Sequence, residues 1–178
     1  PSLFSNKRVI VSTVTKNLQD QLFLKDIPFI RRHLFPDLRV TCMKGRSNYL
    51  CLKKLYDQTG DEPEELQEHW KDLLAWTEKT QTGDRSELNW MGDDDFQWRH
   101  LDARSDTCTG QKCPHFSQCY VTRMRQKALE SDLIIVNHAL FFANLALETD
   151  EIGRALPNFS VLILDEAQGV ENVATSHF

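Results

Sequence analysis

Apolar runs alternate with helically spaced apolar residues at both ends of this chain. Residues 7–13 form a β-branched apolar run behind two basic residues, which predicts a strand buried on both faces. Apolar side chains at roughly helical spacing follow over 18–34, where Thr15 is placed to cap a helix and Pro28 to kink or interrupt it. Residues 38–43 predict a second strand. Together these segments predict a parallel strand–helix–strand unit with a right-handed crossover.

The same alternation returns after residue 119. Helices are predicted over 120–130 and 139–147, and strands over 132–137 and 159–164. The last strand delivers two adjacent carboxylates, Asp165 and Glu166, at its carboxyl end. Because α/β proteins bind their ligands at the carboxyl edge of a parallel sheet, this position predicts a functional site.

The pattern is lost between the two halves, which indicates an insertion into the sheet. Residues 63–80 are its clearest helix, with acidic residues near the amino end and Trp70 and Trp76 interpreted as core. Residues 81–106 predict a loop. We expect too little periodic apolar sequence in residues 44–130 to close a core without further constraint.

The length of 178 residues fits one domain with an insert. No apolar run approaches the length of a membrane span, and the opening residues lack the apolar core of a signal peptide, so a cytoplasmic chain without membrane contact is expected. The chain begins at Pro1, and we therefore expect it to be a fragment. In a reducing compartment its five cysteines are expected to be ligands or buried thiols.

The net charge of −5 argues against a protein that coats nucleic acid, but charge is divided along the chain. Residues 57–95 contain thirteen acidic and three basic residues. The flanking stretches 44–54 and 108–127, which carry cysteines, contain four basic residues each and no acid. Two interpretations stay open: a metal-bearing end that faces phosphates, or a solvated acidic helix between ordinary flanks.

Four cysteines share a spacing that is typical of one metal site. Cys51 is separated by 56 residues from a tight loop that contains Cys108, Cys113 and Cys119, while Cys42 stands apart. One distant ligand and one loop fit thiolate-bound zinc and an iron–sulfur cluster equally well. The spacing does not choose between them.

The carboxylates after the last strand fit nucleotide hydrolysis. Asp165 is suited to holding a hydrated Mg²⁺ ion, and Glu166 to orienting and deprotonating an attacking water. A P-loop enzyme also needs G-x-x-x-x-G-K-[ST], and none of the seven glycines is followed by Lys and then Ser or Thr. We expect the phosphate cradle to precede Pro1, and the chain alone to be inactive.

Five segments in this order resemble the iron–sulfur helicases of the XPD/DinG family, most closely the bacterial DinG branch. They are residues 9–22 (VIVSTVTKNLQDQL), 44–51 (KGRSNYLC), the C-x4-C-x5-C loop, 133–139 (LIIVNHA) and 161–168 (VLILDEAQ). The resemblance covers nearly the whole chain, from helicase motif Ia to motif II. It implies a RecA-like P-loop NTPase motor domain in residues 1–43 and 131–178, and an inserted, mainly α-helical cluster domain in residues 44–130.

The resemblance also implies function: an ATP-dependent DNA helicase that moves 5′ to 3′ and unwinds DNA in repair or replication. Its cofactors are ATP, Mg²⁺ and a 4Fe–4S cluster bound by Cys51, Cys108, Cys113 and Cys119. Asp165 and Glu166 take the Mg²⁺-binding and catalytic roles in motif II, with Ala167 and Gln168. The family has His where Gln168 stands, and an amide cannot become cationic.

The expected partners are single-stranded and forked DNA, with single-strand DNA-binding or repair proteins, in the cytoplasm at the nucleoid. The residues expected to face DNA belong to motif Ia and to the two basic stretches: Thr13, Thr15, Lys16, Arg46, Tyr49, Arg123 and Arg125. Tyr49 is as well suited to packing as to stacking on a base. The alternative function is a stand-alone module, stabilised by an iron–sulfur cluster or zinc, that binds nucleic acid or another protein without catalysis.

Overall fold

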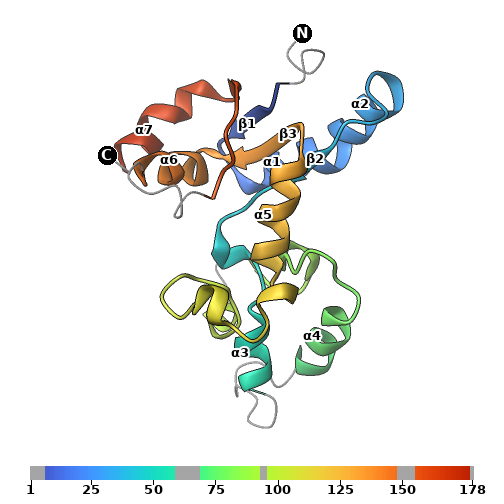
Figure 1. Cartoon of the computed structure of the whole chain (residues 1–178), viewed down its shortest axis with the longest axis vertical. Coiled ribbons are helices and arrows are strands. Elements are labelled where there is room, and N and C mark those ends of the chain that lie inside the picture. The colour runs from blue at the N-terminus through green and yellow to red at the C-terminus, as the bar shows by residue number, and fades with distance from the viewer. Residues whose placement is uncertain (1–6, 59–68, 93–95, 148–154, 177–178) are drawn as a thin grey trace. The chain divides into compact units, whose positions relative to one another are not determined.

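The computed structural model describes residues 7–58, 69–92, 96–147 and 155–176. Two compact units are present (Figure 1). Unit 1 comprises Pro1–Lys44 and Arg125–Phe178, and unit 2 comprises Gly45–Met124. Helix α5 (Tyr120–Glu130) contributes residues to both.

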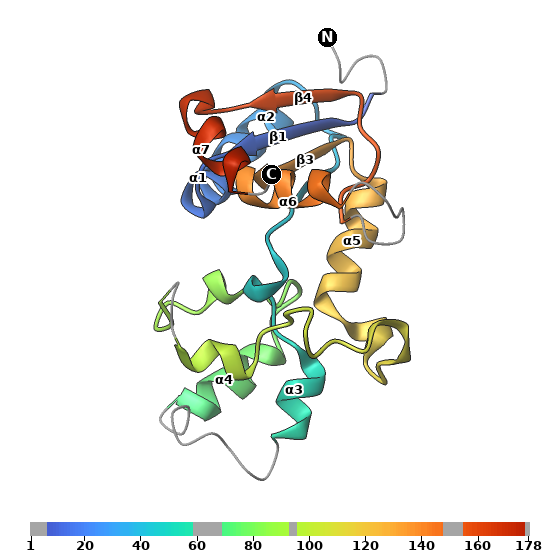
Figure 2. The same ribbon diagram turned by 90° about the vertical axis from the view of Figure 1, so that its left-hand side faces the viewer.

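A four-stranded sheet forms the centre of unit 1. Its strands are β1 (Val9–Thr13), β2 (Val40–Cys42), β3 (Leu133–Asn137) and β4 (Val161–Leu164). All three neighbouring pairs are parallel, in the order β2-β3-β1-β4, which confirms the predicted α/β class and parallel sheet. Strand β1 therefore lies inside the sheet, with β4 beside it at the edge (Figure 2).

The first crossover is helical but irregular. It consists of α1 (Lys16–Gln21), the π-helical turn η2 (Leu22–Asp26) and α2 (Ile27–His33). The predicted cap is confirmed, because Thr15 Oγ1 accepts a hydrogen bond from the Leu18 amide at 3.2 Å. Pro28 lies in the first turn of α2, where a helix does not need its missing N–H. The expected interruption is thus the π-turn before the proline.

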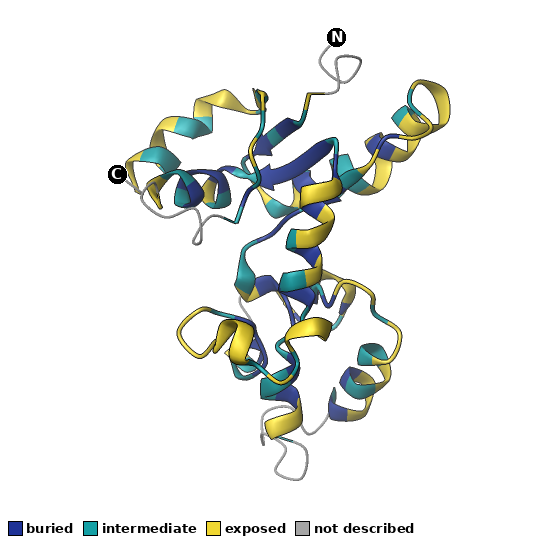
Figure 3. Ribbon diagram, viewed as in Figure 1, coloured by how far each residue is buried: buried dark blue, intermediate teal, exposed yellow. Residues whose placement is uncertain are grey.

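Opposite faces of the sheet are covered by different helices. One face packs against α1, η2 and α2 through a buried cluster of Ile27, Leu38, Leu133 and Ile135. On the other face, α6 (His138–Ala146) contacts β1 and β3, and α7 (Val170–Thr175) contacts α6. Strand residues of both faces are buried, as predicted for β1 (Figure 3).

Strand β4 differs from its neighbours. Ile163 and Leu164 are 50% and 37% exposed, although both are apolar. Because β4 pairs only with β1 among the described strands, one edge of β4 is open. An open edge with exposed apolar side chains is typical of a strand that pairs with a further segment.

Unit 2 is built around the extended segment of residues 49–51. Its backbone pairs on one side with Gly83, through the Leu50 amide at 2.9 Å, and on the other with Leu101, through the Cys51 amide at 2.7 Å. The α-helices among its described residues are α3 (Leu52–Asp57), α4 (Trp70–Thr77) and the beginning of α5. Short 3₁₀ turns make up much of the rest: Arg46–Asn48, Arg85–Glu87, Phe96–His100, Gly110–Lys112 and Phe116–Gln118.

Outside the cysteine loop, residues 44–130 bury more apolar side chains than we expected from their sequence. Twelve apolar residues of unit 2, none of them in the described loop 104–119, are less than one-tenth exposed: Tyr49, Leu50, Leu52, Leu55, Trp70, Leu73, Leu88, Met91, Trp98, Leu101, Tyr120 and Val121. Several of them belong to the predicted loop 81–106, where 3₁₀ turns hide the apolar spacing from an analysis based on helix and strand periods. Of the helix predicted over 63–80, residues 63–68 lie outside the described part, and α4 covers 70–77.

A buried carboxylate joins two segments of this core. Asp102 is 1% exposed and accepts hydrogen bonds from Lys54 at 3.2 Å and from Arg104 at 2.8 Å. Burial raises the pKa of Asp102, but the hydrogen bonds from Arg104 and Lys54 lower it further, so that it lies below its ordinary value. Asp102 therefore stabilises unit 2 in its ionised form.

We expect Asp102→Asn to lower the free energy of unfolding at pH 7 by on the order of 2 kcal/mol, because two cations lose a charged partner. Since the folded pKa is depressed, the stabilisation is complete above the ordinary value of 3.8 and is lost as the pH falls below it. Urea unfolding at pH 7 and pH 3 measures this difference. Asp57→Asn, which removes an exposed partner of Lys53, is the matched control and should change little. A variant Asp102→Asn that is as stable as the wild-type protein at pH 7 would contradict the account.

Candidate functional site at the carboxyl edge of the sheet

The carboxyl ends of three parallel strands meet at one edge of unit 1. Thr13 of β1 lies opposite Asn137 of β3, and Ser12 lies opposite Leu164 of β4. The chain therefore brings Asp165, the residue that follows β4, next to the end of β1. This is the arrangement that the sequence predicted for the carboxylates.

Asp165 is held by two consecutive residues of β1. Its backbone amide donates a hydrogen bond of 2.8 Å to the Ser12 carbonyl, and its Oδ2 atom accepts one of 3.3 Å from Thr13 Oγ1. The Thr13 side chain is fully buried. In this structure Thr13 therefore contacts the candidate site and presents no surface to DNA, in contrast to our expectation from motif Ia.

Glu166 occupies a strained corner. It has φ 52° and ψ 49°, which makes it the one non-glycine residue with positive φ in the described part of the chain. This left-handed conformation costs about 1–2 kcal/mol for a residue with a Cβ atom. Its side chain is exposed and accepts a hydrogen bond from Gln168 Nε2. Because such strain tends to persist at functional positions, it supports a role for this carboxylate.

The turn after Glu166 packs closely against motif Ia. The turn η9 (Ala167–Gly169) ends at Gly169, where a Cβ atom would lie 3.0 Å from Val14 Cγ2. That distance is tighter than ordinary van der Waals contact, so a larger residue would displace the turn or Val14. The carboxylates and the segment after β1 are therefore coupled by packing as well as by hydrogen bonds.

Sequence reasoning gave no role to two polar residues beside this site. Ser12 Oγ and His138 Nδ1 lie 2.6 Å apart, and both side chains are fully buried. The sequence alone places His138 directly after Asn137, at a strand-to-helix corner. In the structure Asn137 caps α6 by accepting a hydrogen bond from the Leu140 amide at 2.8 Å. The partner across the sheet was not visible.

Helix α1 holds the chain that follows the end of β2. Gln19 is fully buried, and its Nε2 atom donates to the Met43 carbonyl at 2.9 Å. Asp20 pairs with Lys44 at 2.8 Å, and the Lys44 side chain is 3% exposed. Lys44 belongs to a basic stretch for which facing phosphates was one of two open interpretations, but here its buried side chain is paired with the partly exposed Asp20. Lys16, also expected at DNA, is half-buried.

The other residues expected to bind DNA have different surroundings. Tyr49 is 3% exposed and belongs to the core of unit 2, so no base can stack on its ring in this structure. Arg46 is half-buried and donates to the Ala103 carbonyl at 2.9 Å. Arg123 is exposed on α5, and Arg125 is half-buried.

All five cysteines are free thiols. Cys51 immediately precedes α3, and Cys108 Sγ lies 3.4 Å from the Gly110 amide, which donates to it. In α3, the pKa of Lys53 is raised by its hydrogen bond with Asp57 and by the charge of that carboxylate. Within the described residues, however, no three His, Cys, Asp or Glu side chains are placed to hold a metal ion. The thiols are chemically suited to bind zinc or an iron–sulfur cluster, but their positions in this structure do not form a metal site.

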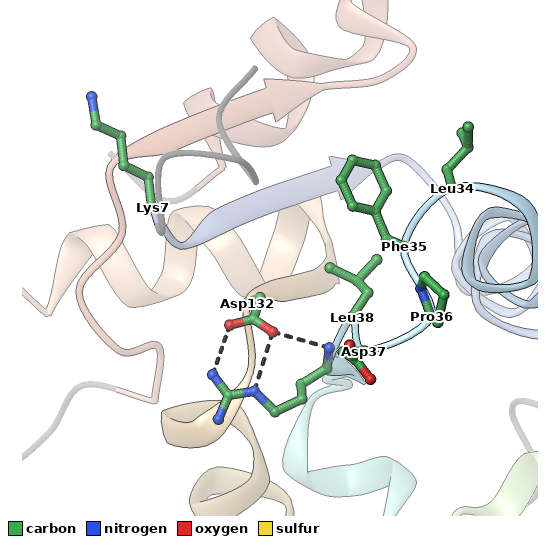
Figure 4. A pocket seen from close by; sticks show the side chains of 8 residues that line it. Lys7, Leu34, Phe35, Pro36, Asp37, Leu38 and Asp132 are labelled. Atoms are coloured by element: carbon green, nitrogen blue, oxygen red, sulfur yellow. Dashed lines mark hydrogen bonds and ion pairs between the residues drawn. The ribbon is translucent and has the colours of Figure 1, made fainter.

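A pocket lies at the opposite, amino edge of the sheet (Figure 4). Apolar residues 34–36 and Leu38 form one wall, and Lys7 and Asp132 lie on the other side. Arg39 binds both oxygens of Asp132, at 2.7 and 3.1 Å, and this hydrogen bonding lowers the pKa of Asp132. Because these residues precede the strands, we assign the pocket no part in the candidate site.

No family model matches the chain. It is 39% and 36% identical, over its whole length, to the ATP-dependent DNA helicases YoaA of Haemophilus influenzae and Escherichia coli. It is 31% identical, over 94% of its length, to the ATP-dependent DNA helicase DinG of Salmonella typhimurium. The chain spans 28% of the length of both YoaA proteins and 25% of that DinG.

The fold and these matches define one segment of a helicase motor protein. The chain belongs to the family of the DinG and YoaA helicases, which confirms the resemblance seen in the sequence. Among the described residues, no helix has both the length and the apolar character that crossing a membrane requires.

The strain at Glu166 predicts a difference between two substitutions. Glu166→Gly and Glu166→Ala both remove the carboxylate and its hydrogen bond with Gln168, but only glycine adopts φ 52° without strain. We expect the glycine variant to be about 1 kcal/mol more stable than the alanine variant. Denaturant unfolding of the two purified chains tests this. An alanine variant as stable as the glycine variant would show that this corner is not strained.

Proposed function

We propose that the chain is the segment of a DinG-like DNA helicase that supplies the Mg²⁺-binding and water-activating half of an ATP site. The observation that carries the proposal is the position of Asp165, which lies at the carboxyl end of β4 and is bonded by Ser12 and Thr13 of β1. The homology to ATP-dependent DNA helicases supports it. The complete protein would move 5′ to 3′ along single strands and unwind forked DNA in repair or replication.

The residues of the site suit separate steps. Bound Mg²⁺ would supply positive charge at the phosphate oxygens. Asp165, oriented by Thr13, would hold that hydrated ion, and Glu166 would orient the attacking water and accept its proton. Gln168 donates to Glu166 and so would fix the direction of its carboxylate. A neutral amide can fill this role, although the family has His at this position.

The phosphate-binding half is absent from the sequence, because no G-x-x-x-x-G-K-[ST] motif occurs in it. The open edge of β4, with Ile163 and Leu164 exposed, supports a further parallel strand at that side in the complete helicase. We propose that this strand leads into the phosphate-binding loop.

For DNA we propose a reduced set of residues. Thr15 and Arg123 are exposed, and Lys16, Arg46 and Arg125 are partly exposed, so their side chains have access to a strand. Backbone phosphates would be their targets, since Lys and Arg dominate such contacts. Single-strand DNA-binding or repair proteins would be further partners, in the cytoplasm at the nucleoid.

We also propose a 4Fe–4S cluster on Cys51, Cys108, Cys113 and Cys119. Their spacing, their free thiols and the backbone N–H bond to Cys108 support it. The alternative is a stand-alone module in which zinc or a cluster stabilises a surface for nucleic acid or protein. The buried apolar residues of unit 2 support this alternative, because they give the unit a core of its own.

Two expectations about catalysis follow from the proposed ATP site. The isolated 178 residues should not hydrolyse ATP, with or without DNA, because they lack the phosphate-binding loop. In the complete helicase, Glu166→Gln should leave ATP binding nearly unchanged and abolish hydrolysis and unwinding. Nucleotide affinity and steady-state ATPase rates measure both. Turnover by the isolated chain, or equal loss of binding and hydrolysis in the variant, would refute the assignment.

The proposed cluster can be tested by colour. Protein prepared without oxygen should be brown, and serine at Cys51, Cys108, Cys113 or Cys119 should bleach it, because an alcohol is a poor substitute for a soft thiolate. Cys42→Ser is the matched control and should keep the colour. Since unit 2 has its own core, loss of the metal should speed proteolysis in the loop 108–119 and not in 81–104. Colourless protein with stoichiometric zinc would support the alternative.

A further inference from the structure

The hydrogen bond between Ser12 and His138 has no part in the proposed function above, yet Ser12 also contacts Asp165. Ser12 is the residue whose carbonyl accepts the Asp165 amide, and its side chain bonds to His138. Both side chains are fully buried. Burying two polar groups costs free energy that an apolar pair of similar size would not, and the compensation is a directional bond.

The hydrogen-bond inventory of the described residues favours one tautomer of His138. If Nδ1 carried the proton, both the Ser12 hydroxyl proton and the Nε2 lone pair would lack partners, because Nε2 has none among the described residues. If the Ser12 hydroxyl donates to Nδ1, only the Nε2–H group is left unsatisfied. The second arrangement leaves fewer buried groups without a partner, so of the two tautomers the one in which Nδ1 accepts from Ser12 is favoured.

His138 lies in a position that is fixed by the capped amino end of a helix. It is the first residue of α6, whose amino end is capped by Asn137 at the end of β3. The bond from His138 therefore ties the end of β1 to the end of its neighbour β3. On the side of β1 that faces β4, Asp165 is hydrogen-bonded to Ser12 and Thr13. Two hydrogen bonds through Ser12 thus link the first residue of α6 to the backbone of Asp165.

We propose that His138 is a positioning residue that acts through Ser12 to hold Asp165 in place. Its acceptor nitrogen fixes the rotamer of Ser12 and thereby the end of β1, which sets both hydrogen bonds to Asp165. The consequence for hydrolysis rests on the function proposed above. The consequence for the Asp165 backbone does not, because it requires neither nucleotide nor Mg²⁺.

Two substitutions of His138 separate the acceptor from the volume that it fills. Asparagine places an amide oxygen near the position of Nδ1 and can accept from Ser12, whereas leucine has similar bulk and no acceptor. Ser12→Ala removes the donor from the other side. The readouts are the hydrogen-exchange rate of the Asp165 amide in the purified chain, and kcat and KM for ATP in the complete helicase.

We expect the exchange of the Asp165 amide to rise about tenfold or more in His138→Leu and Ser12→Ala, with the amides of β3 unaffected. In the helicase, kcat should fall by about ten- to a hundredfold at unchanged KM, because the carboxylate is misplaced and ATP contacts are not removed. His138→Asn should restore both toward wild type. Nitrogen NMR of the wild-type chain should find the proton of His138 on Nε2.

Four results would overturn the proposal: a proton on Nδ1 of His138, unchanged exchange at Asp165 in folded His138→Leu, an asparagine variant as impaired as leucine, or an unchanged kcat. If the leucine variant does not fold, Ser12→Ala, His138→Asn and the tautomer still decide. A wild-type helicase without ATPase activity would refute the proposed function alone, since the exchange and NMR measurements stand without it.

Discussion

The hydrogen bonds between the end of β1 and Asp165 are the contacts on which the candidate site depends. Strand β1 lies inside the sheet, so its backbone is fixed by neighbours on both sides, and its last two residues hold Asp165 through a carbonyl and a hydroxyl. The same strand leads directly into Thr15 and α1. A displacement of Asp165 would therefore move the start of the segment that leads into α1, and a movement of that segment would displace Asp165 in return.

Much of unit 1 could be predicted because its elements obey simple periods. The apolar runs that became β1, β3 and β4 are short and β-branched, and Asp165 follows one of them without a gap, so its place at the sheet edge followed from the parallel fold. The His138 contact could not be predicted in this way. It joins residues 126 positions apart, and the order of strands that brings them together is set by tertiary packing.

Unit 2 shows where periodicity fails. Its core draws on 3₁₀ turns and extended single segments, which have no repeating apolar pattern long enough to recognise, so Leu88 and Trp98 were assigned to a loop and are buried. The sequence left the surroundings of Tyr49 and Lys44 open for a related reason. Both types of side chain are usually found at surfaces or interfaces, and only the contacts of the folded chain reveal that one is core and the other half of a buried ion pair.

The central claim is that the ends of β1 and β4 form the Mg²⁺-binding half of an ATP site. A crystal structure of the complete helicase with Mg²⁺ and a non-hydrolysable ATP analogue tests it most directly. The account predicts the hydrated ion beside the Asp165 carboxylate, with Thr13 still donating to that carboxylate. A Mg²⁺ ion and terminal phosphates bound away from the ends of these two strands would contradict it.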